Sequence, residues 1–345
     1  MKKKALIFGI TGQDGYYLSN FLLNKNYEVH GIKRKASTIY SYRTDKLYEK
    51  FFLTKKPTFF LHYGDVTDSI SILNLVKKIK PDEIYNLAAQ SHVQVSFEIP
   101  DYSSNVDALG TLRILEVIKN LNRSIKFYQA SSSEMFGNIK APQNEKSLFA
   151  PNSPYSISKL YSYWITRAYR DAYKIFATNG ILFNHESPLR GETFVTKKIT
   201  QYVAKEKLKK NNQLLSLGNL NSKRDWGHAK DYVKAMWLMM QQKKPDDFVI
   251  ATGKSTSVRK FVEISFNFIG IKIIWRGKGV NEIGINKKTG KKLIKIDKRL
   301  FRPNEVHFLK GNINKAKKNL KWKPTISLNK LIEEMINFDL IKFKK

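Results

Sequence analysis

The sequence contains no cysteine, which excludes disulfide bonds, thiolate nucleophiles and cysteine-ligated zinc. Its six histidines are scattered along the chain, so we expect no metal site. The apolar stretch near the start is short and ends at glycines, which is typical of a strand and not of a signal peptide. No later stretch is long and apolar enough to cross a bilayer. We therefore expect a cytoplasmic protein without a membrane partner.

Acidic residues are also scarce: 29 aspartates and glutamates stand against 62 lysines and arginines, a formal net charge of +33. One interpretation is a nucleic-acid-binding protein, because strong basicity attracts polyphosphates. The other is a lysine-rich solvated surface. Lysine far outnumbers arginine and is spread along the chain, and the sequence contains no known nucleic-acid-binding motif. We therefore favour the solvated surface and expect no nucleic-acid partner.

The chain of 345 residues exceeds a typical single domain, and its hydrophobic fraction of 42% is ample for a buried core. Short apolar runs alternate with segments of helical spacing in the first half. The predicted strands are Lys4–Phe8, Tyr27–Ile32, Thr58–His62, Glu83–Ala88, Ile125–Ala130 and Phe176–Phe183. The predicted helices are Asp14–Leu23, Ser69–Lys80, Asn105–Lys119 and Tyr155–Tyr173. Such alternation predicts an α/β fold with a Rossmann-type doubly wound parallel sheet.

After about residue 184 the alternation ends and the segments look mixed. Helical spacing recurs near 195–209, 228–241, 256–268 and 327–339. The stretch 276–292 resembles a surface hairpin or loop, and the basic, tyrosine-rich stretch 33–57 resembles a loop with a partial helix. We expect a Rossmann domain over 1–184, with later segments near 213–240 returning to it, and a smaller mixed α/β lobe over 185–345 that binds substrate.

A glycine-rich turn follows the first predicted strand and opens the first predicted helix. Glycines let the backbone approach a pyrophosphate, and the helix N-terminus offers unpaired N–H groups and a partial positive charge. A plain glycine-rich turn is the alternative, but its position at the start of a doubly wound pattern favours a dinucleotide site. The predicted contacts in this turn are Gly9, Thr11, Gly12, Gln13, Asp14 and Gly15.

The end of the second predicted strand distinguishes the two nicotinamide cofactors. An NAD-binding strand usually ends in an acid that holds the ribose 2′-hydroxyl. Here the strand runs into Lys33, Arg34 and Lys35, and arginine can bind a 2′-phosphate that a carboxylate would repel. We therefore predict NADP, with a solvated charge run as the alternative for Arg34. Further predicted cofactor contacts follow the third and fourth strands: Asp65, Val66, Leu87, Ala88, Ala89, Gln90 and Ser91.

Tyr155 and Lys159 lie four residues apart and share one face of a predicted helix. An ammonium group favours phenolate, so this pair suits proton removal from an alcohol that is being oxidised, although a surface pair is the alternative. Ser132 and Glu134 follow the fifth strand, at the same edge of the sheet. Ser132 is a candidate hydrogen-bond partner of a sugar oxygen. Glu134 is a candidate base for a carbon-bound proton, with a solvated loop glutamate as the alternative.

These motifs together resemble the GDP-mannose 4,6-dehydratase family, within the extended short-chain dehydrogenases/reductases. The resemblance runs nearly from end to end, and the segments NHESP, KRDWGHAKDYV and RPNEV are specific to this family within the superfamily. The other matching segments are GITGQDG at 9–15, LHYGDVTD at 61–68, EIYNLAAQSHV at 83–93, KFYQASSSEMFG at 126–137, SPYSISKLYSYW at 153–164 and FVIATG at 248–253.

The resemblance implies an NADP-dependent lyase that converts GDP-mannose to GDP-4-keto-6-deoxy-mannose and water. In this reaction Tyr155 would take the C4 hydroxyl proton and Glu134 the C5 proton. It also implies self-association as a dimer or tetramer. Further implied cofactor contacts are Tyr102, His185 and Arg190. The implied contacts with the GDP and the sugar are Asn184, Val195, Lys198, Arg224, Arg302 and Glu305.

Two positions depart from the family pattern. Ser132 stands where the family usually has threonine, and Leu189 stands beside Arg190 where it tends to have a basic pair. Another nucleotide-sugar dehydratase or an epimerase stays an alternative, although a simple epimerase has no need of Glu134. A remoter alternative is an inactive Rossmann protein that binds nucleic acid. Residues 35–50 have no obvious place in a Rossmann core, and we expect them at a subunit contact near the cofactor.

Overall fold

The computed structural model describes residues 2–35, 42–121 and 124–344. Seven parallel strands form its main sheet in the order β11-β6-β5-β4-β1-β2-β3. They are β1 (Lys4–Phe8), β2 (Glu28–Lys33), β3 (Phe59–Tyr63), β4 (Glu83–Asn86), β5 (Lys126–Ser132), β6 (Ala177–Leu182) and β11 (Phe248–Ile250). The strand order reverses between β1 and β4, where ligands bind beyond the carboxyl ends. The predicted Rossmann-type sheet is confirmed.

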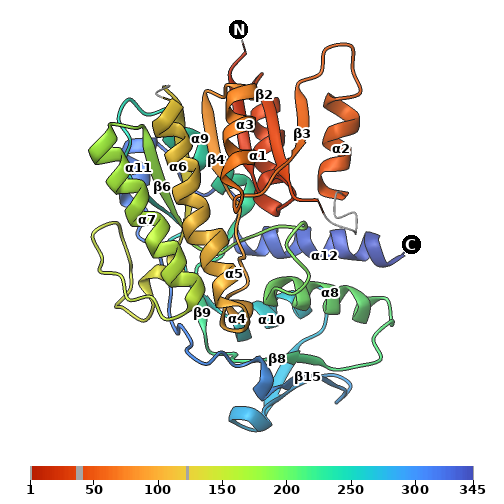
Figure 1. Ribbon diagram of the computed structural model, residues 1–345. Helices are drawn as coiled ribbons and strands as arrows, with labels where there is room; N and C mark the ends of the chain where they lie inside the picture. Colours follow the sequence, from red (N-terminus) through yellow and green to blue (C-terminus); the bar gives the residue numbers. More distant parts are fainter. Residues whose placement is uncertain (1, 36–41, 122–123, 345) are drawn as a thin grey trace.

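Helices cover both faces of this sheet (Figure 1). One layer consists of α3 (Ser69–Ile79), α6 (Gly110–Leu121) and α7 (Pro154–Tyr173). The other consists of α1 (Gln13–Leu23), α9 (Ala229–Met240) and α11 (Asn314–Leu320). Along β1, Ala5 and Ile7 belong to one core cluster and Leu6 and Phe8 to the other. Side chains alternate between the faces of a strand, so a sheet covered on both faces requires such an unbroken apolar run.

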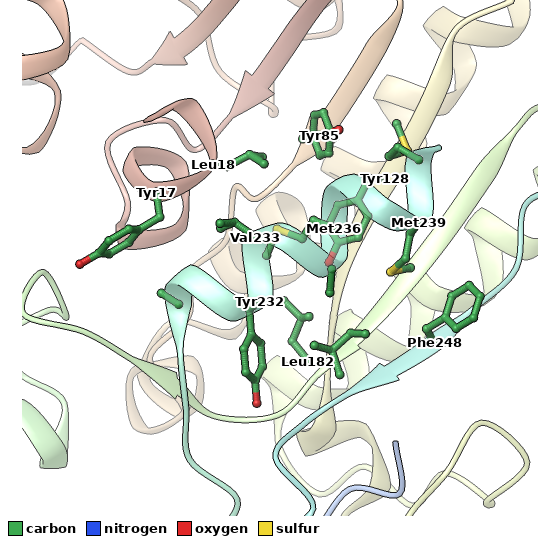
Figure 2. Close-up of a cluster of buried hydrophobic side chains, with 14 of the residues drawn as sticks. Tyr17, Leu18, Tyr85, Tyr128, Leu182, Tyr232, Val233, Met236, Met239 and Phe248 are labelled. Atoms are coloured by element: carbon green, nitrogen blue, oxygen red, sulfur yellow. The ribbon is translucent and has the colours of Figure 1, made fainter. Parts of the chain in front are cut away.

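Figure 2 shows the core between α1, α9 and the sheet. Met236 and Met239 of α9 are at most 1% exposed, and they belong to the same cluster as Tyr85 and Tyr128 of β4 and β5. The two tyrosine rings lie 5.9 Å apart, centre to centre. Methionine fills irregular space around such rings. The helix α9 therefore belongs to the layers of the main sheet, although it follows residue 184 in the sequence.

A second lobe lies below the carboxyl ends of the main strands in Figure 1 and has its own core. Its helices are α8 (Val195–Lys207), α10 (Val258–Phe268) and α12 (Leu328–Lys344). Its sheet has the order β13-β14-β15-β8, with β13 (Ile273–Arg276), β14 (Ile283–Asn286), β15 (Lys292–Ile296) and β8 (Leu215–Leu217). Lys197 Nζ and Asp339 Oδ1, both buried, pair at 2.6 Å and join α8 to α12.

Shorter elements connect the two lobes and complete the chain. Two small ladders pair β7 (His185–Glu186) with β10 (Gly227–His228) and β9 (Lys223–Arg224) with β12 (Thr256–Ser257). The remaining helices are α2 (Tyr42–Phe51), α4 (Val93–Glu98) and α5 (Pro100–Ser104). A π-helical turn covers Asn105–Leu109, and 3-10 turns cover Ser133–Phe136, Gly279–Asn281 and Lys298–Leu300.

Several local predictions differ from the structure. The strand expected over Glu83–Ala88 ends at Asn86. The helix expected from Asn105 begins with a π-helical turn instead. The three-residue strand β11 was missed because it is too short for any periodicity. The expected hairpin near 276–292 is confirmed, since β14 and β15 pair antiparallel.

The stretch 33–57 contains α2, as the expected partial helix, but residues 36–41 lie outside the described residues. The subunit contact expected at 35–50 therefore stays a prediction. None of the helices within the described ranges has both the length and the apolarity needed to cross a membrane.

Candidate active site

A cavity of about 550 Å³ lies where the carboxyl ends of the main strands meet the second lobe. One wall comes from the glycine-rich turn and the ends of β4, β5 and β6, and the other from α8, β9 and residues 299–305. Every predicted site residue lines this cavity except Gln90. The N–H of Gln90 donates to Asp107 Oδ1 at 2.7 Å, and its side chain bonds the main chain of His92.

The glycine-rich turn is shaped by contacts that leave no space for side chains. Gly9 has a φ of +80°, and a Cβ atom there would lie 2.8 Å from the carbonyl oxygen of Leu87. A Cβ atom at Gly15 would lie 2.4 Å from the carbonyl oxygen of Ile10. Helix α1 follows directly, with Gly12 as its N-cap, and the first N–H groups of a helix lack partners within it. The turn therefore fits a pyrophosphate.

Asp14 and His185 form a charged pair at the edge of this turn. His185 Nε2 lies 2.6 Å from Asp14 Oδ2, and its Nδ1 lies 2.8 Å from the carbonyl oxygen of Phe183. Burial by itself lowers the pKa of His185, but the charge and hydrogen bond of Asp14 raise it above its ordinary value. Burial by itself raises the pKa of Asp14, but the charge of His185 brings the pKa of Asp14 below its usual range. The pair thus holds the chain after β6 against α1.

The far end of the cavity carries the residues predicted to bind the adenosine part of a cofactor. Arg34 follows β2 and donates a hydrogen bond to the hydroxyl of Tyr102. Asp65 follows β3, and one of its carboxylate oxygens accepts from the N–H and hydroxyl of Thr67 at 2.9 and 2.8 Å. A cationic side chain and a carboxylate therefore line this part of the cavity, just after β2 and β3.

Arg43 is a residue of this region that sequence reasoning missed. It extends from α2, and its Nη1 and Nε donate to the carbonyl oxygens of Thr11 and Leu189 at 3.0 and 3.1 Å. It therefore ties α2 to the glycine-rich turn and to the loop before α8. The sequence signal was weak, because Arg43 stands in a basic stretch without a recognised motif.

The four predicted catalytic residues come from three elements. Ser132 ends β5 and Glu134 lies in the following 3-10 turn, where Ser132 Oγ accepts the Glu134 N–H at 3.2 Å. Tyr155 and Lys159 lie in the first turns of α7, whose start is fixed by a capping box formed by Ser153 and Ser156. Lys159 Nζ lies 5.9 Å from the centre of the Tyr155 ring. The spacing of four residues thus yields the expected shared face.

Burial disfavours the charged forms of both residues on α7. It raises the pKa of Tyr155 well above its ordinary value, and a hydrogen bond with Ser132 opposes this rise. Burial also lowers the pKa of Lys159, whose Nζ donates to the carbonyl oxygen of Ala130 at 3.2 Å. Asp107 opposes that decrease. Proton transfer at Tyr155 therefore depends on how well its surroundings stabilise a phenolate.

Glu134 faces two arginines from the second lobe. Its Oε1 lies 3.9 Å from Arg224 Nε and 3.8 Å from Arg302 Nη1. Arg224 Nη2 also pairs with Glu305 Oε1 at 2.9 Å. Glu134 Oε2 and Asn184 Oδ1 are buried and lack a hydrogen-bond partner among the residues that the structure describes. Unpaired buried polar atoms are costly, so their presence at one cavity indicates a ligand site.

Sequence reasoning also missed His92 and Asp107. His92 lines the cavity, and its Nδ1 accepts the N–H of Val95 at 3.4 Å as the N-cap of α4. Burial, followed by the charges of Arg302 and Lys198, lowers the pKa of His92, which favours the neutral ring. A polar residue directly before a short helix was the available signal for His92. Asp107 stands inside a helical pattern and had no such signal.

Comparison with known proteins shows the family to which this chain belongs. Residues 6–335 match the family model described as GDP-mannose 4,6 dehydratase. The GDP-mannose 4,6 dehydratase of Cricetulus griseus is 53% identical over 342 residues, which cover 98% of this chain and 92% of that protein. The enzyme of the same name from Homo sapiens is 53% identical, with 97% and 91% coverage. GDP-mannose 4,6-dehydratase of Yersinia enterocolitica is 51% identical, with 99% and 95% coverage.

Solved structures share the fold at much lower identity. A UDP-glucose 4-epimerase of Thermotoga maritima superposes with a TM-score of 0.80 at 20% identity, covering 99% of each chain. A dTDP-glucose 4,6-dehydratase of Bacillus anthracis gives a TM-score of 0.79 at 18% identity, covering 97% of this chain and 96% of that one. These structural similarities show the fold alone, whereas the sequence matches over nearly the whole chain show the family. The chain belongs to the GDP-mannose 4,6-dehydratase family.

Proposed function

We propose that this chain is a hydro-lyase that converts GDP-mannose to GDP-4-keto-6-deoxy-mannose and water with bound NADP. The observation that carries the proposal is that Ser132, Glu134, Tyr155 and Lys159 line one cavity together with the glycine-rich turn. The family match over residues 6–335 supports the substrate. A simple epimerase would not need the buried carboxylate of Glu134, which is 7% exposed.

The residues present fit a dinucleotide. The glycine-rich turn and the start of α1 would hold the pyrophosphate, Arg34 the 2′-phosphate, Asp65 the adenine, and Lys159 the ribose next to the nicotinamide. When bound, the nicotinamide supplies a reversible acceptor for hydride, so the overall reaction consumes no oxidant. Arg34 and its neighbours Lys33 and Lys35 support NADP over NAD, because a carboxylate at this position would repel the extra phosphate.

Tyr155 begins the proposed reaction by taking the proton of the C4 hydroxyl as C4 is oxidised to a ketone. Ser132 Oγ would hydrogen-bond the C4 oxygen, and its hydrogen bond with Tyr155 supports this role. Lys159 stabilises the phenolate by its charge. The C4 ketone then makes the neighbouring C5 proton acidic.

Glu134 removes the C5 proton in the second step, and the C6 hydroxyl leaves as water. The electron pair of the C5–H bond forms a C5–C6 double bond, while the C6–O bond breaks and the departing hydroxyl takes up the proton that Glu134 has removed. Two observations support this role: Glu134 lines the cavity, and its buried Oε2 has no hydrogen-bond partner in the described ranges. C5 then regains a proton, and C6 receives the hydride that was removed from C4 and becomes a methyl group.

We propose that the GDP and the sugar are bound by Asn184, Val195, Lys198, Arg224, Arg302 and Glu305. Arg224 and Arg302 would pair with the diphosphate, and Glu305 would accept hydrogen bonds from the ribose or the guanine. Asn184, Val195 and Lys198 line the same wall. Both ligands would thus bind beyond the carboxyl ends of the main strands, which is where doubly wound proteins bind their ligands.

Incubation of the protein with GDP-mannose and NADP tests this proposal. We expect a product lighter by one water, identified by mass spectrometry, and no net reduction of the cofactor. An epimerase would return a product of unchanged mass. A nucleic-acid-binding protein would leave GDP-mannose intact and bind DNA with an affinity that falls steeply with salt.

Replacement of Arg34 by alanine should weaken NADP binding by about ten- to a hundred-fold, the usual size of a charge-assisted hydrogen bond, and NAD binding much less. Isothermal titration with both cofactors measures the two affinities. Lys56→Ala, at an exposed residue outside the cavity lining, serves as the control for a general loss of positive charge. An equal loss for both cofactors in Arg34→Ala would rule out the 2′-phosphate contact.

We further propose that the chain self-associates, as a dimer or tetramer, through the segment 35–50 near the cofactor. Arg43 already links α2 to the glycine-rich turn, so a contact at this segment would communicate with the cofactor site. Light scattering should therefore give a mass at least twice that of the 40.0 kDa chain. A monomer at working concentration would contradict this proposal.

A further inference from the structure

The segment FVIATG at 248–253 resembles the family, but the proposed reaction gives it no role. Its first three residues form β11 at the edge of the main sheet. Its last two residues, Thr252 and Gly253, do not line the cavity, and both donate hydrogen bonds to Asp225. The segment therefore contacts the neighbourhood of the site through this carboxylate.

Asp225 is 0% exposed and accepts hydrogen bonds from four donors. Its Oδ1 accepts from the N–H and the hydroxyl of Thr252 at 2.7 and 2.5 Å. Its Oδ2 accepts from the N–H groups of Gly253 and Gly311 at 2.9 and 3.2 Å. Four donors use the acceptor capacity of a carboxylate. Asp225 therefore anchors the chain after β9 to two other loops.

The two glycine donors have backbone geometries that exclude most side chains. Gly253 has a φ of +78°, in the region that favours glycine. A Cβ atom at Gly311 would lie only 2.3 Å from the Cβ atom of Ala251, so glycine is needed for this close approach. The glycine that ends FVIATG and the glycine at 311 are thus both required for the anchor of Asp225.

Successive side chains around Arg224 alternate between the cavity and the anchor. Ser222, Arg224 and Trp226 line the cavity, whereas Lys223 and Asp225 do not. Such alternation is the geometry of an extended chain, in which neighbouring side chains leave the backbone on opposite sides. Fixing Asp225 on one side therefore fixes the direction in which Arg224 leaves the chain on the other.

The main-chain pairing beside Arg224 is short. β9 has two residues, and Arg224 is paired with Thr256 of β12 at the end of this ladder. The next attachment is the N–H of Gly227, which donates to the carbonyl oxygen of Asn184 at 2.9 Å. Asp225 lies between these two attachments, so its hydrogen bonds connect the supports of two proposed substrate contacts, Arg224 and Asn184.

We propose that Asp225 is a positioning residue that orients Arg224 toward the diphosphate of the bound nucleotide sugar. This inference rests on the proposed function, in which Arg224 pairs with that diphosphate. A guanidinium binds phosphate oxygens through hydrogen bonds of fixed direction, so a small displacement of the chain that carries it loses affinity. Asp225 acts through Arg224, because its own side chain lies outside the cavity lining.

Asp225→Asn keeps the shape of the side chain but replaces one acceptor oxygen by an NH2 group. This group would meet two of the four donors, so two hydrogen bonds are lost and Arg224 shifts. The variant, saturated with NADP, should bind GDP about tenfold more weakly, because a displaced Arg224 keeps only part of its contact. Isothermal titration with GDP measures this affinity without turnover. The affinity for NADP should stay unchanged, since the glycine-rich turn lies in the other wall.

Combination with Arg224→Ala decides whether Asp225 acts through Arg224. Arg224→Ala by itself should weaken GDP binding by about ten- to a hundred-fold, the usual size of a charge-assisted contact. The double variant should bind GDP within about twofold of Arg224→Ala, because no guanidinium is left to be displaced. If Asp225 served only the stability of the fold, the two losses would multiply.

A milder pair of variants keeps the test valid if Asp225→Asn does not fold. Thr252→Val removes only the hydroxyl that donates to Asp225 and should weaken GDP binding about threefold. Thr252→Ser retains the hydroxyl and should bind GDP normally.

Asp231→Asn is the matched control for removing a buried carboxylate. Asp231 Oδ2 accepts the N–H groups of Thr325 and Ile326 at 2.8 and 3.0 Å, and Asp231 does not line the cavity. Its variant should have a lower melting temperature, as Asp225→Asn should, but an unchanged affinity for GDP.

Unchanged GDP affinity in Asp225→Asn, or in Thr252→Val where the first variant does not fold, would overturn the inference. Losses that multiply in the double variant would overturn it too, and so would normal GDP binding by Arg224→Ala, which would also refute the proposed diphosphate contact. A protein that shows the expected GDP affinities but does not dehydrate GDP-mannose would instead contradict the proposed reaction, and the positioning of Arg224 would stand.

Discussion

Replacement of Glu134 by glutamine should slow the loss of water from GDP-mannose by about a hundred- to ten-thousand-fold, the usual contribution of a single catalytic base. Glutamine keeps the size and hydrogen-bonding capacity of a side chain that is 7% exposed, so the cavity should keep its shape. The variant should still bind GDP-mannose and oxidise C4. Because elimination cannot follow, absorbance of the reduced nicotinamide should appear within one turnover and persist.

The control for this prediction is Glu263→Gln. Glu263 lies on α10, where its carboxylate pairs with Lys260 at 3.3 Å and accepts the indole N–H of Trp275 at 3.1 Å. It does not line the cavity, so its replacement should leave dehydration unchanged. Stopped-flow absorbance and product mass, measured on the same samples, separate oxidation from elimination. If Glu134→Gln dehydrates GDP-mannose at nearly the unmodified rate, Glu134 is a loop residue and the second step of the mechanism is wrong.

Replacement of Tyr155 by phenylalanine should block the reaction one step earlier. The phenol is the group that takes the C4 hydroxyl proton, so neither reduced nicotinamide nor product should form above about a hundredth to a ten-thousandth of the normal rate. Phenylalanine keeps the ring in the first turn of α7, where the capping box of Ser153 and Ser156 fixes the helix start. The melting temperature and GDP-mannose affinity should therefore change little.

Tyr161→Phe on the same helix is the matched control. Its ring is 40% exposed and does not line the cavity, so the variant should react normally. Single-turnover absorbance distinguishes the two catalytic residues, because Glu134→Gln should accumulate reduced nicotinamide and Tyr155→Phe should not. Accumulation in Tyr155→Phe would show that another group removes the C4 hydroxyl proton.

The resemblance in sequence was sufficient to identify the family, and the match over residues 6–335 confirms it. Local patterns also predicted most strands of the main sheet and most helices that cover it, because the apolar pattern that defines each element lies within one short segment. The same patterns failed at β11, which has three residues, and at the π-helical turn Asn105–Leu109. Neither element has a period of its own, and each depends on packing against distant parts of the chain.

The sequence by itself determined the residue types of the candidate site and the order of the elements that carry them. The shared face of Tyr155 and Lys159 follows from helical spacing. The glycine-rich turn follows from residues such as Gly9, which tolerates the positive φ that the turn requires.

Only the tertiary structure decided which charges face one another. It brought Glu134 close to both Arg224 of β9 and Arg302, and it left Gln90 outside the lining of the cavity. Such interactions depend on distance in space and on burial. For residues far apart in the chain, both quantities are set only when the main sheet and the second lobe pack together, so the sequence alone does not give them.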